Sequence, residues 1–502
     1  MPSDTAPAHA TQSLSPPARI ADGVTVALVC IAIWWALIGR PVVLFSGLRD
    51  ILSPSIVIYL AGCVQVVRHL MWPKPSALSR LRDLHAAILE RPHLAAALRA
   101  FFMTRPAVFA VAFAAVITLG ITSTPGFVLS RDPLDNLPAR FDAGWYGGIA
   151  LDGYTWDHTF QRQRNIAFFP ALPLLTRPVG AVLGMYEEGP SRERKMLRGL
   201  WAGVAISLAA FFWALYYLSR LASDLIGPDR APAAALLLAA YPFACYFNAP
   251  YTESLFLLGS AGACYHFLRR DWVAASAWGL LAGLSRPNGF LLSVPLAILA
   301  LQARASARGP SEARGRRARA LGGGAPSALI NDDKGSGVFV RIAVSAMPAV
   351  GMLLFTLYLY QLTGGVWFAW ARSHEAWGRS YGGLAPILSF AERLRDEPWL
   401  QLITDNPYNA INAVGVIFAL VLTYPVFRKL GLAWGVFVLI NLVPPLLAGG
   451  LLSTGRLTST LFPLFLALAA VVPPRAVPGW AALFGIGQGF CAALFFSWRA
   501  MY

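Results

Sequence analysis

The sequence predicts an all-α polytopic membrane protein with about 13 transmembrane helices. Of its 502 residues, 57% are hydrophobic and only 13% are charged, whereas soluble domains carry about 25% charged residues. Apolar runs recur along the whole chain, and most have the length of about 17–25 residues that a helix needs to cross a bilayer. Basic residues gather in short clusters between these runs, as they do in cytoplasmic loops of membrane proteins.

The predicted spans follow the apolar runs in order. They lie at about 23–39, 51–67, 107–128, 199–218, 231–247, 252–268, 272–284, 290–301, 340–362, 409–424, 431–448, 457–472 and 480–496. Several are short or interrupted by proline or glycine. Such spans are tolerated where other helices or a watery cavity cover them.

The chain divides into three parts by composition. Residues 1–22 are polar and rich in Pro, Ala and Ser, which predicts a disordered N-terminus. Residues 23–106 hold two lead-in helices and a basic cytoplasmic segment, in which Leu78, Leu81, Leu84 and Ile88 share one face of an amphipathic helix. Residues 107–502 form a core with an outer loop at 129–198, a flexible basic cytoplasmic linker at 302–339 and an outer aromatic loop at 363–408.

Alternation of the spans assigns the loops to the two sides of the membrane. With the basic segments 68–105 and 302–339 inside, the two outer loops and the turns at 248–253, 285–289 and 453–456 share the opposite face. The basic stretch 191–198 falls on that outer face against the rule. Residues 168–183 are therefore predicted to form a re-entrant or surface-lying helix, broken by Pro170, Pro173 and Pro178, rather than a full span.

Composition also argues against several functions. The net charge is +16, but the basic residues lie between apolar runs, so nucleic-acid binding is not predicted. The five cysteines all lie inside apolar segments without metal-ligand or disulfide spacing. Neither a cofactor nor a metal is predicted, since the single Asp157-His158 pair is too little for a metal site. The Ala/Arg/Pro-rich composition favours a bacterial cytoplasmic membrane as the location.

The outer loop from Arg140 to Leu175 mixes carboxylates, aromatic residues, a histidine and glycines. Asp142 follows a span by a short connection, so its carboxylate can lie at the membrane surface and accept a proton from an attacking hydroxyl. The alternative is that Asp142 caps a helix beginning at Ala143. Asp132, Asp135, Asp152 and Asp157 are rival carboxylates, of which the first two flank Pro133 as turn residues.

Ionisable residues near the membrane boundary are the second set of candidates. Arg286 lies at an outer turn between two apolar runs, and its planar fork suits a phosphate group. Glu253 lies at another boundary, and the alternative is that Glu253 and Arg286 pair with each other or reach to the surface. Arg456 and Arg379 are further candidates for a phosphate, or else solvated loop residues.

Aromatic residues cluster after residue 362: Trp367, Trp370, Trp377 and Tyr381. Aromatic residues at a membrane edge usually form an interfacial belt. The alternative is that they stack against a sugar ring in an acceptor site.

Several of these motifs together resemble the PIG-V-like mannosyltransferase family of the GT-C superfamily of membrane glycosyltransferases. The matching residues are Arg140-Phe141-Asp142-Ala143, Trp145-Tyr146, Ile149-Ala150, Gly153-Tyr154, Ala167-Phe168-Phe169-Pro170, Pro173-Leu174, Pro250 to Phe256, Ser285 to Gly289, Trp377-Gly378-Arg379, Gly455-Arg456 and Phe462-Pro463. They keep the family's order from about Ala107 onward. The family often has tryptophan before the aspartate, where this chain has Phe141.

The resemblance implies an inverting transfer of a sugar, most specifically mannose, from a polyprenyl-phosphate donor on the non-cytoplasmic face. The acceptor would be a hydroxyl of a lipid-linked or surface glycan, and Asp142 would be the general base. Donor phosphate would be bound by Arg286, Arg456 and Arg379. Further substrate contacts would come from Arg140, Trp145, Tyr146, Asp157, His158, Glu253, Asn288 and Trp377.

Two other classes of protein remain open from the sequence. A transporter or flippase of a lipid-linked sugar would also use intramembrane Arg and Glu with broken helices, although the chain has no obvious inverted repeat. A protein that only binds or scaffolds partners would keep its function after Asp142→Asn. The sequence names no partner subunit.

Overall fold

The computed structural model describes residues 15–38, 54–72, 86–122, 125–307, 337–378, 382–499 and 501. Within these ranges the regular elements are all helices, and no strand occurs, which confirms the predicted all-α class. The chain forms two compact units that divide after Pro92. Of the predicted disordered N-terminus 1–22, residues 1–14 lie outside the described residues, whereas residues 16–22 were predicted wrongly, because they begin helix α1 (Pro16–Ile38). Most of the linker at 302–339 and Leu78, Leu81 and Leu84 of the predicted amphipathic helix also lie outside the described residues.

The first unit is a pair of helices, α1 (Pro16–Ile38) and α2 (Pro54–Met71), which pack along each other. Ala32 and Val57 are buried between them. The pair also shares polar contacts: the Arg68 guanidinium lies 3.3 Å from the Asp22 carboxylate, and Gln65 donates to Asp22 and Thr25. These contacts compensate charges that would otherwise face an apolar surrounding.

The second unit, His93–Tyr502, contains the remaining helices. They are α4 (Pro92–Thr118), α5 (Ala143–Asp152), η2 (Asn165–Ala167), α6 (Ala171–Val182), α7 (Arg192–Ile226), η3 (Pro228–Arg230), α8 (Ala231–Ala240), η4 (Pro242–Asn248), α9 (Glu253–Leu268), α10 (Trp272–Ser285), η5 (Pro287–Leu292), α11 (Ser293–Ala307), α14 (Val338–Ser345), α15 (Met347–Leu362), α16 (Ala369–Ser373), η6 (His374–Trp377), α17 (Ala385–Asp396), α18 (Trp399–Asp405), α19 (Pro407–Lys429), α20 (Leu432–Gly449), α21 (Thr454–Thr458), α22 (Phe462–Val471), η7 (Pro474–Ala476) and α23 (Val477–Phe496).

Five helices among the described residues are long and apolar enough to cross a membrane, and the number rises to seven if each bent pair counts as one span. The bent pairs are α8 with η4, which meet at 78°, and α14 with α15, which meet at 44°. Other predicted spans correspond to helices of 10–16 residues, such as α9, α10 and α22. The count of about 13 spans stays a prediction.

Helix α9 lies at the centre of the second unit. Every one of its residues except His266 is buried, and it packs against α7 and α10. A helix that is enclosed on all sides need not be long enough to span lipid by itself. Its first residue, Glu253, therefore has a position fixed by the packing of the whole helix.

The third predicted span begins earlier than expected. Helix α4 starts at Pro92 rather than at Ala107 and continues through Arg105 and Pro106. The prediction placed Arg105 in the basic cytoplasmic segment that precedes the span. In the structure Arg105 is buried by protein and donates hydrogen bonds of 2.6 Å to the carbonyls of Ala239 and Ala244 and to the side chain of Asn248. It thereby satisfies the carbonyl groups exposed where the chain bends between α8 and η4.

We expect Arg105→Met to destabilise the protein, because each buried carbonyl left without a donor costs about 1–3 kcal/mol. Thermal unfolding in detergent, followed by intrinsic fluorescence, measures the change. Arg99→Met, six residues earlier at an exposed position of α4, is the matched control and should leave the melting temperature nearly unchanged. Equal melting temperatures for the two variants would contradict a structural role for Arg105.

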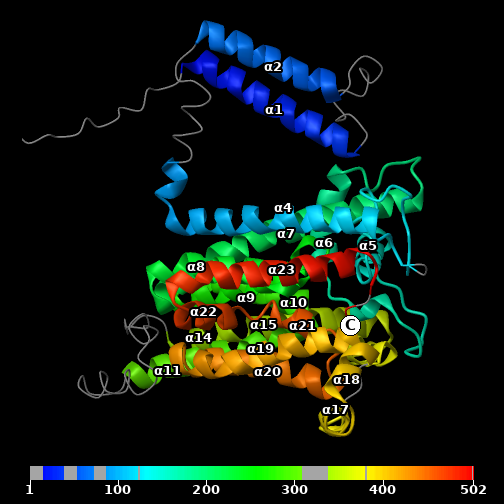
Figure 1. The fold of residues 1–502 in the computed structure, drawn as a ribbon, viewed down its shortest axis with the longest axis vertical. Coiled ribbons are helices and arrows are strands. Elements are labelled where there is room, and N and C mark those ends of the chain that lie inside the picture. Colours follow the sequence, from blue (N-terminus) through cyan, green and yellow to red (C-terminus); the bar gives the residue numbers. More distant parts are fainter. Residues whose placement is uncertain are drawn as a thin grey trace, which may run out of the picture. The chain divides into compact units, whose positions relative to one another are not determined.

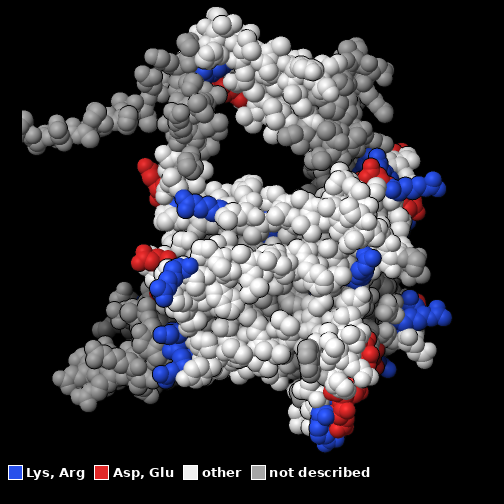
Figure 2. Space-filling model, in the orientation of Figure 1, with Lys and Arg blue, Asp and Glu red and all other residues white. Residues whose placement is uncertain are grey.

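The chemically rich segments gather at one end of the second unit. In Figure 1, α5 and α6 lie at the same end as α17 and α18, whereas the end of α11 and the start of α14 lie at the other. Figure 2 shows the charged residues of this unit mainly near the two ends of the helices, with a largely uncharged band between them. This arrangement is that expected of a bundle whose middle lies in lipid.

The proline-rich segment after residue 168 forms a short helix, as predicted. Helix α6 has 12 residues, with Pro170 just before it and Pro178 inside it. At 1.5 Å per residue it reaches about 18 Å, too little to cross a hydrocarbon core of about 30 Å.

The basic stretch at 191–198, which disagreed with the predicted orientation, is compensated by carboxylates at the same end of the unit. Arg194 pairs with Asp135 at 3.1 Å, and Arg198 pairs with Glu187 at 2.9 Å. Arg192 forms an ion pair with Asp152.

Candidate functional site

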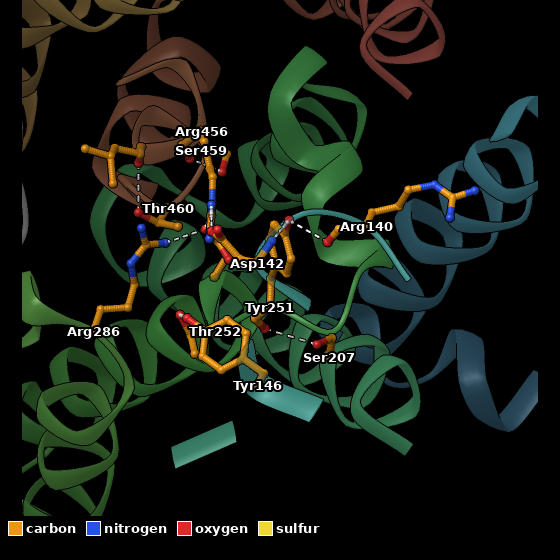
Figure 3. A network of polar contacts seen from close by, with 12 residues as sticks. Arg140, Asp142, Tyr146, Ser207, Tyr251, Thr252, Arg286, Arg456, Ser459 and Thr460 are labelled. Carbon is orange, nitrogen blue, oxygen red and sulfur yellow. Dashed lines mark hydrogen bonds and ion pairs between the residues drawn. The ribbon is translucent and has the colours of Figure 1, made fainter. Parts of the chain in front are cut away.

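Four charged side chains from distant parts of the chain meet at the end of the bundle that carries α5. Asp142 precedes α5, Glu253 begins α9, Arg286 follows α10, and Arg456 lies in α21. Nη1 of Arg456 lies 2.7 Å from Oδ2 of Asp142, and Nη1 of Arg286 lies 2.7 Å from Oε1 of Glu253. Arg456 also donates through Nε to the same Glu253 oxygen. The result is a continuous chain of alternating charges, Asp142–Arg456–Glu253–Arg286 (Figure 3).

The backbone around Asp142 is held in place on both sides. Arg140 is completely buried and donates to the carbonyls of Phe496, Asn136 and Ala139 at 2.6–2.7 Å. Phe141 has a φ of 44°, a left-handed conformation that a bulky residue adopts only where its surroundings enforce it. The hydroxyl of Tyr251 accepts from the Asp142 N–H and donates to the Arg140 carbonyl, each at 3.1 Å.

The Asp142 carboxylate does not cap α5, although the residue stands at the N-cap position. Its side chain instead makes the ion pair with Arg456 and keeps 27% of its surface exposed. The capping alternative is therefore wrong, and the carboxylate is both paired and reachable from solvent.

Arg456 reaches Asp142 from α21, a five-residue helix that follows Ser453, whose φ is 56°. The side chain of Asn412 accepts a hydrogen bond from the N–H of Gly455 at 2.8 Å and so fixes this short helix to α19. The Arg456 guanidinium lies over the ring of Tyr251, 4.3 Å from its centre. A ring face stabilises a cation, so Tyr251 supports both members of the Asp142–Arg456 pair.

Glu253 is the most enclosed member of the cluster. Its side chain has no exposed surface, against 10% for Arg286 and 13% for Arg456. One carboxylate oxygen serves both arginines, while the other, Oε2, is buried without a hydrogen-bond partner in the structure. The two carboxylates and two guanidinium groups sum to no net charge, so an incoming phosphate would add the only uncompensated charge.

Arg286 is positioned by the turn η5, which packs very closely on α10. A Cβ atom on Gly289 would lie 2.0 Å from the carbonyl oxygen of Ala282, so only glycine fits there. Asn288 of the same turn donates to Asn441 of α20 at 2.7 Å. This contact places Asn288 in a structural pair beside the cluster.

We expect Gly289→Ala to move η5 and displace Arg286 from Glu253. The protein should lose thermal stability by about 1–3 kcal/mol, the usual cost of overpacking, and lose donor binding with it. Gly148→Ala, at a position in α5 where a Cβ meets nothing within 4 Å, is the control. Similar thermal unfolding curves for the two variants would contradict the proposed close packing.

Tyr146 of α5 lies beside the cluster, with its hydroxyl 3.3 Å from that of Thr252. Burial raises the pKa of Tyr146 to about 12, so its hydroxyl stays protonated at neutral pH. Tyr146 can donate or accept a hydrogen bond there but cannot serve as a base.

Trp145 and Trp377 meet in an aromatic cluster. The rings of Trp145 and Phe168 stack with centres 5.6 Å apart, and Trp377 packs edge-on against both at 5.5 and 5.4 Å. The outer aromatic segment before residue 378 therefore touches the loop that carries Asp142. The remaining predicted partner, Arg379, lies outside the described residues, as does Tyr381.

The rival acidic residues have other partners. Asp157 pairs with Arg164 at an exposed position, and His158 beside it is exposed with a φ of 62°. Asp132 accepts from the N–H groups of Leu134 and Asp135, as a turn residue does. No group of three or more His, Cys, Asp or Glu suited to a metal ion occurs within the described ranges.

Sequence reasoning did not single out Tyr251, Phe168 or Asn441 as parts of the site. Tyr251 is close in sequence to Glu253, in a predicted outer turn. Its position beside that candidate residue could have identified it as part of the site. Asn441 lies inside an apolar run, where a lone buried amide usually has a polar partner. Nothing in the local sequence identifies that partner as Asn288.

Fold and site together define an all-α membrane protein with a charged cluster at one end of its bundle. No family model matches the chain, and no curated protein matches it. Among solved structures it is similar to the oligosaccharyltransferase of Archaeoglobus fulgidus in complex with zinc and sulfate, with 14% identity over 79% of this chain and 53% of that one and a TM-score of 0.37.

Two further structures of the oligosaccharyltransferase from Archaeoglobus fulgidus also match. One is tethered to an acceptor peptide containing the NVT sequon, with 13% identity, coverage of 79% of this chain and 55% of that chain, and a TM-score of 0.37. The other, AglB with an inhibitory peptide and a dolichol-phosphate, has 13% identity, coverage of 79% and 56%, and a TM-score of 0.35. The chain thus spans about half the length of these structures, and a likeness at this level assigns no role to any residue here.

Proposed function

We propose that the protein is a membrane glycosyltransferase that moves a hexose from a polyprenyl-phosphate donor to a hydroxyl group of a glycolipid or glycan acceptor. The observation that carries this proposal is the partly exposed Asp142 carboxylate, which lies next to the guanidinium of Arg456. Arg286 is connected to Arg456 through the carboxylate of Glu253. A transfer of this kind needs a proton acceptor at one end and a cation for the departing phosphate at the other. The cluster supplies both within hydrogen-bond distance.

In the proposed reaction the acceptor oxygen attacks the anomeric carbon from the side opposite the phosphate. The new C–O bond forms as the bond from the anomeric carbon to the phosphate oxygen breaks, and the configuration inverts. The acceptor proton passes to the Asp142 carboxylate and is later released to water. The electron pair of the broken bond stays on polyprenyl phosphate, whose added charge is stabilised by the guanidinium groups of Arg456 and Arg286.

The resemblance of the sequence motifs to PIG-V-like mannosyltransferases supports mannose as the sugar and the non-cytoplasmic face as the side of reaction. The cluster lies at the end of the bundle that carries α5, opposite the end of α11 and the start of α14 (Figure 1), which is consistent with the second point. An acceptor sugar could contact the aromatic cluster next to Asp142. Trp145 and Phe168 of this cluster belong to the loop that carries Asp142, and Trp377 packs against them.

The test incubates the purified full chain with polyprenyl-phosphate mannose, polyprenyl-phosphate glucose and GDP-mannose, each with a panel of glycolipid and glycan acceptors. We expect transfer from a polyprenyl-phosphate sugar and none from the nucleotide sugar. Transfer only from GDP-mannose, or no transfer together with movement of labelled lipid-linked sugar across proteoliposomes, would contradict the proposal. The second outcome would favour a flippase.

A further inference from the structure

The proposed base and the proposed phosphate-binding group are bonded to each other. Nη1 of Arg456 donates to Oδ2 of Asp142 at 2.7 Å. One carboxylate oxygen is thus engaged and its charge compensated, and the same N–H of Arg456 cannot also bind a phosphate. In this arrangement the two groups hold each other through one N–H and one carboxylate oxygen.

The two ion pairs of Arg456 differ in how enclosed they are. The pair with Asp142 involves a side chain that is 27% exposed, whereas the Glu253 side chain is fully buried. A partly exposed pair contributes little to stability, but a buried carboxylate that loses its partner pays a large desolvation penalty. Of the two contacts, the one with Asp142 is therefore the one that a ligand can replace at low cost.

Arg456 is anchored to the cluster at Nε. Nε is bonded to Glu253, and the ring centres of Tyr251 and Tyr246 lie 4.3 and 5.4 Å from the guanidinium. Because the guanidinium is planar, Nη1 moves only with the whole group, and a tilt about the hydrogen bond from Nε to Glu253 would carry Nη1 away from Asp142. Phosphate oxygens accept two parallel N–H bonds from a guanidinium, so they can compete with a single bond to a carboxylate.

We propose that Arg456 is shared between Asp142 and the donor phosphate, so that donor binding draws the guanidinium away and releases the carboxylate for the acceptor hydroxyl. This inference rests on the proposed function, because it takes the ligand to be a polyprenyl phosphate. It makes Glu253 a positioning residue, which keeps Arg456 in the site in both arrangements. It also sets an order: the donor binds first, and the base becomes available only afterwards.

The test measures binding of polyprenyl phosphate without a sugar, which carries the same phosphate but cannot react. Binding to the purified full chain in detergent is followed by isothermal titration calorimetry. Because Asp142 competes for Arg456, Asp142→Asn should tighten binding by about 2- to 5-fold, the worth of an ion pair near the surface. Asp142→Ala should do the same, and Glu188→Gln, which removes an exposed charge from the same outer loop outside the cluster, should change nothing.

Binding to an Arg456→Gln variant distinguishes the sharing of Arg456 from simple charge repulsion between Asp142 and the phosphate. In Arg456→Gln protein, phosphate binding should be weaker, and adding Asp142→Asn should bring no further gain, since the shared group is gone. A gain that persists in that background, or weaker binding by Asp142→Asn alone, would overturn the proposal. Each variant is checked by its melting temperature. Because binding does not require transfer, a lack of sugar transfer with the coupling intact would refute the proposed function and leave the sharing standing.

Discussion

Replacing Asp142 by asparagine is expected to lower the rate of sugar transfer about 10²- to 10⁴-fold, the usual contribution of a positioned general base. Asparagine keeps the shape of the side chain and can still accept a hydrogen bond from Arg456, so the fold should survive. It cannot take a proton from the acceptor. The measurement is the initial rate of transfer at saturating donor and acceptor.

Glu188→Gln is the matched control for this result. It removes a carboxylate from the same outer loop, at an exposed position outside the cluster. Its transfer rate should stay close to that of the unmodified protein. Full activity of Asp142→Asn would refute the role of Asp142 as base and would leave a protein that only binds or scaffolds partners.

Replacing Glu253 by glutamine is expected to lower the free energy of unfolding by about 3–5 kcal/mol, the cost of leaving a buried charge without its partner. In this variant an amide oxygen can still accept hydrogen bonds, but Arg286 and Arg456 lose the negative charge that they share, and both are nearly enclosed. Arg456 keeps Asp142, so most of the loss should come from Arg286. Thermal and denaturant-induced unfolding in detergent measure the change.

Asp152→Asn provides the comparison for an exposed ion pair. Asp152 and its partner Arg192 are 45% and 60% exposed, so the change should be below about 1 kcal/mol. If Glu253→Gln unfolded at the same temperature as Asp152→Asn, other groups would have to stabilise Arg286 and Arg456. Glu253 would then not be the residue that holds the cluster together.

Much of the fold could be predicted because lipid imposes a simple rule on composition. Apolar runs identified the helical class, and alternation of the spans placed the turns of Glu253, Arg286 and Arg456 on the same side as Asp142. The structure brings these four residues into one cluster. The prolines at 170, 173 and 178 predicted a helix that does not cross the membrane, and α6 is indeed short, although it continues through Pro178.

Other features lie beyond sequence patterns because they depend on contacts between distant residues. Arg105 was predicted to lie in the basic cytoplasmic segment, yet it lies inside α4, and the broken helix α8–η4 supplies carbonyls that accept its hydrogen bonds. Asp142 and Arg456 are 314 residues apart, and no local spacing reveals that they pair. The contacts of Tyr251 with Asp142 and with Arg456 depend on the same tertiary arrangement.

The enclosure of α9 has a consequence for how the protein could change over time. Its packing fixes Glu253 from the core side, whereas Asp142 and the aromatic cluster belong to segments that lie over the end of the bundle. A related protein that uses a different acceptor could therefore differ in those overlying segments while keeping α9 and Glu253 unchanged. Variation in substrate preference among descendants of this chain should therefore be confined to the periphery, with the interior helix inherited intact.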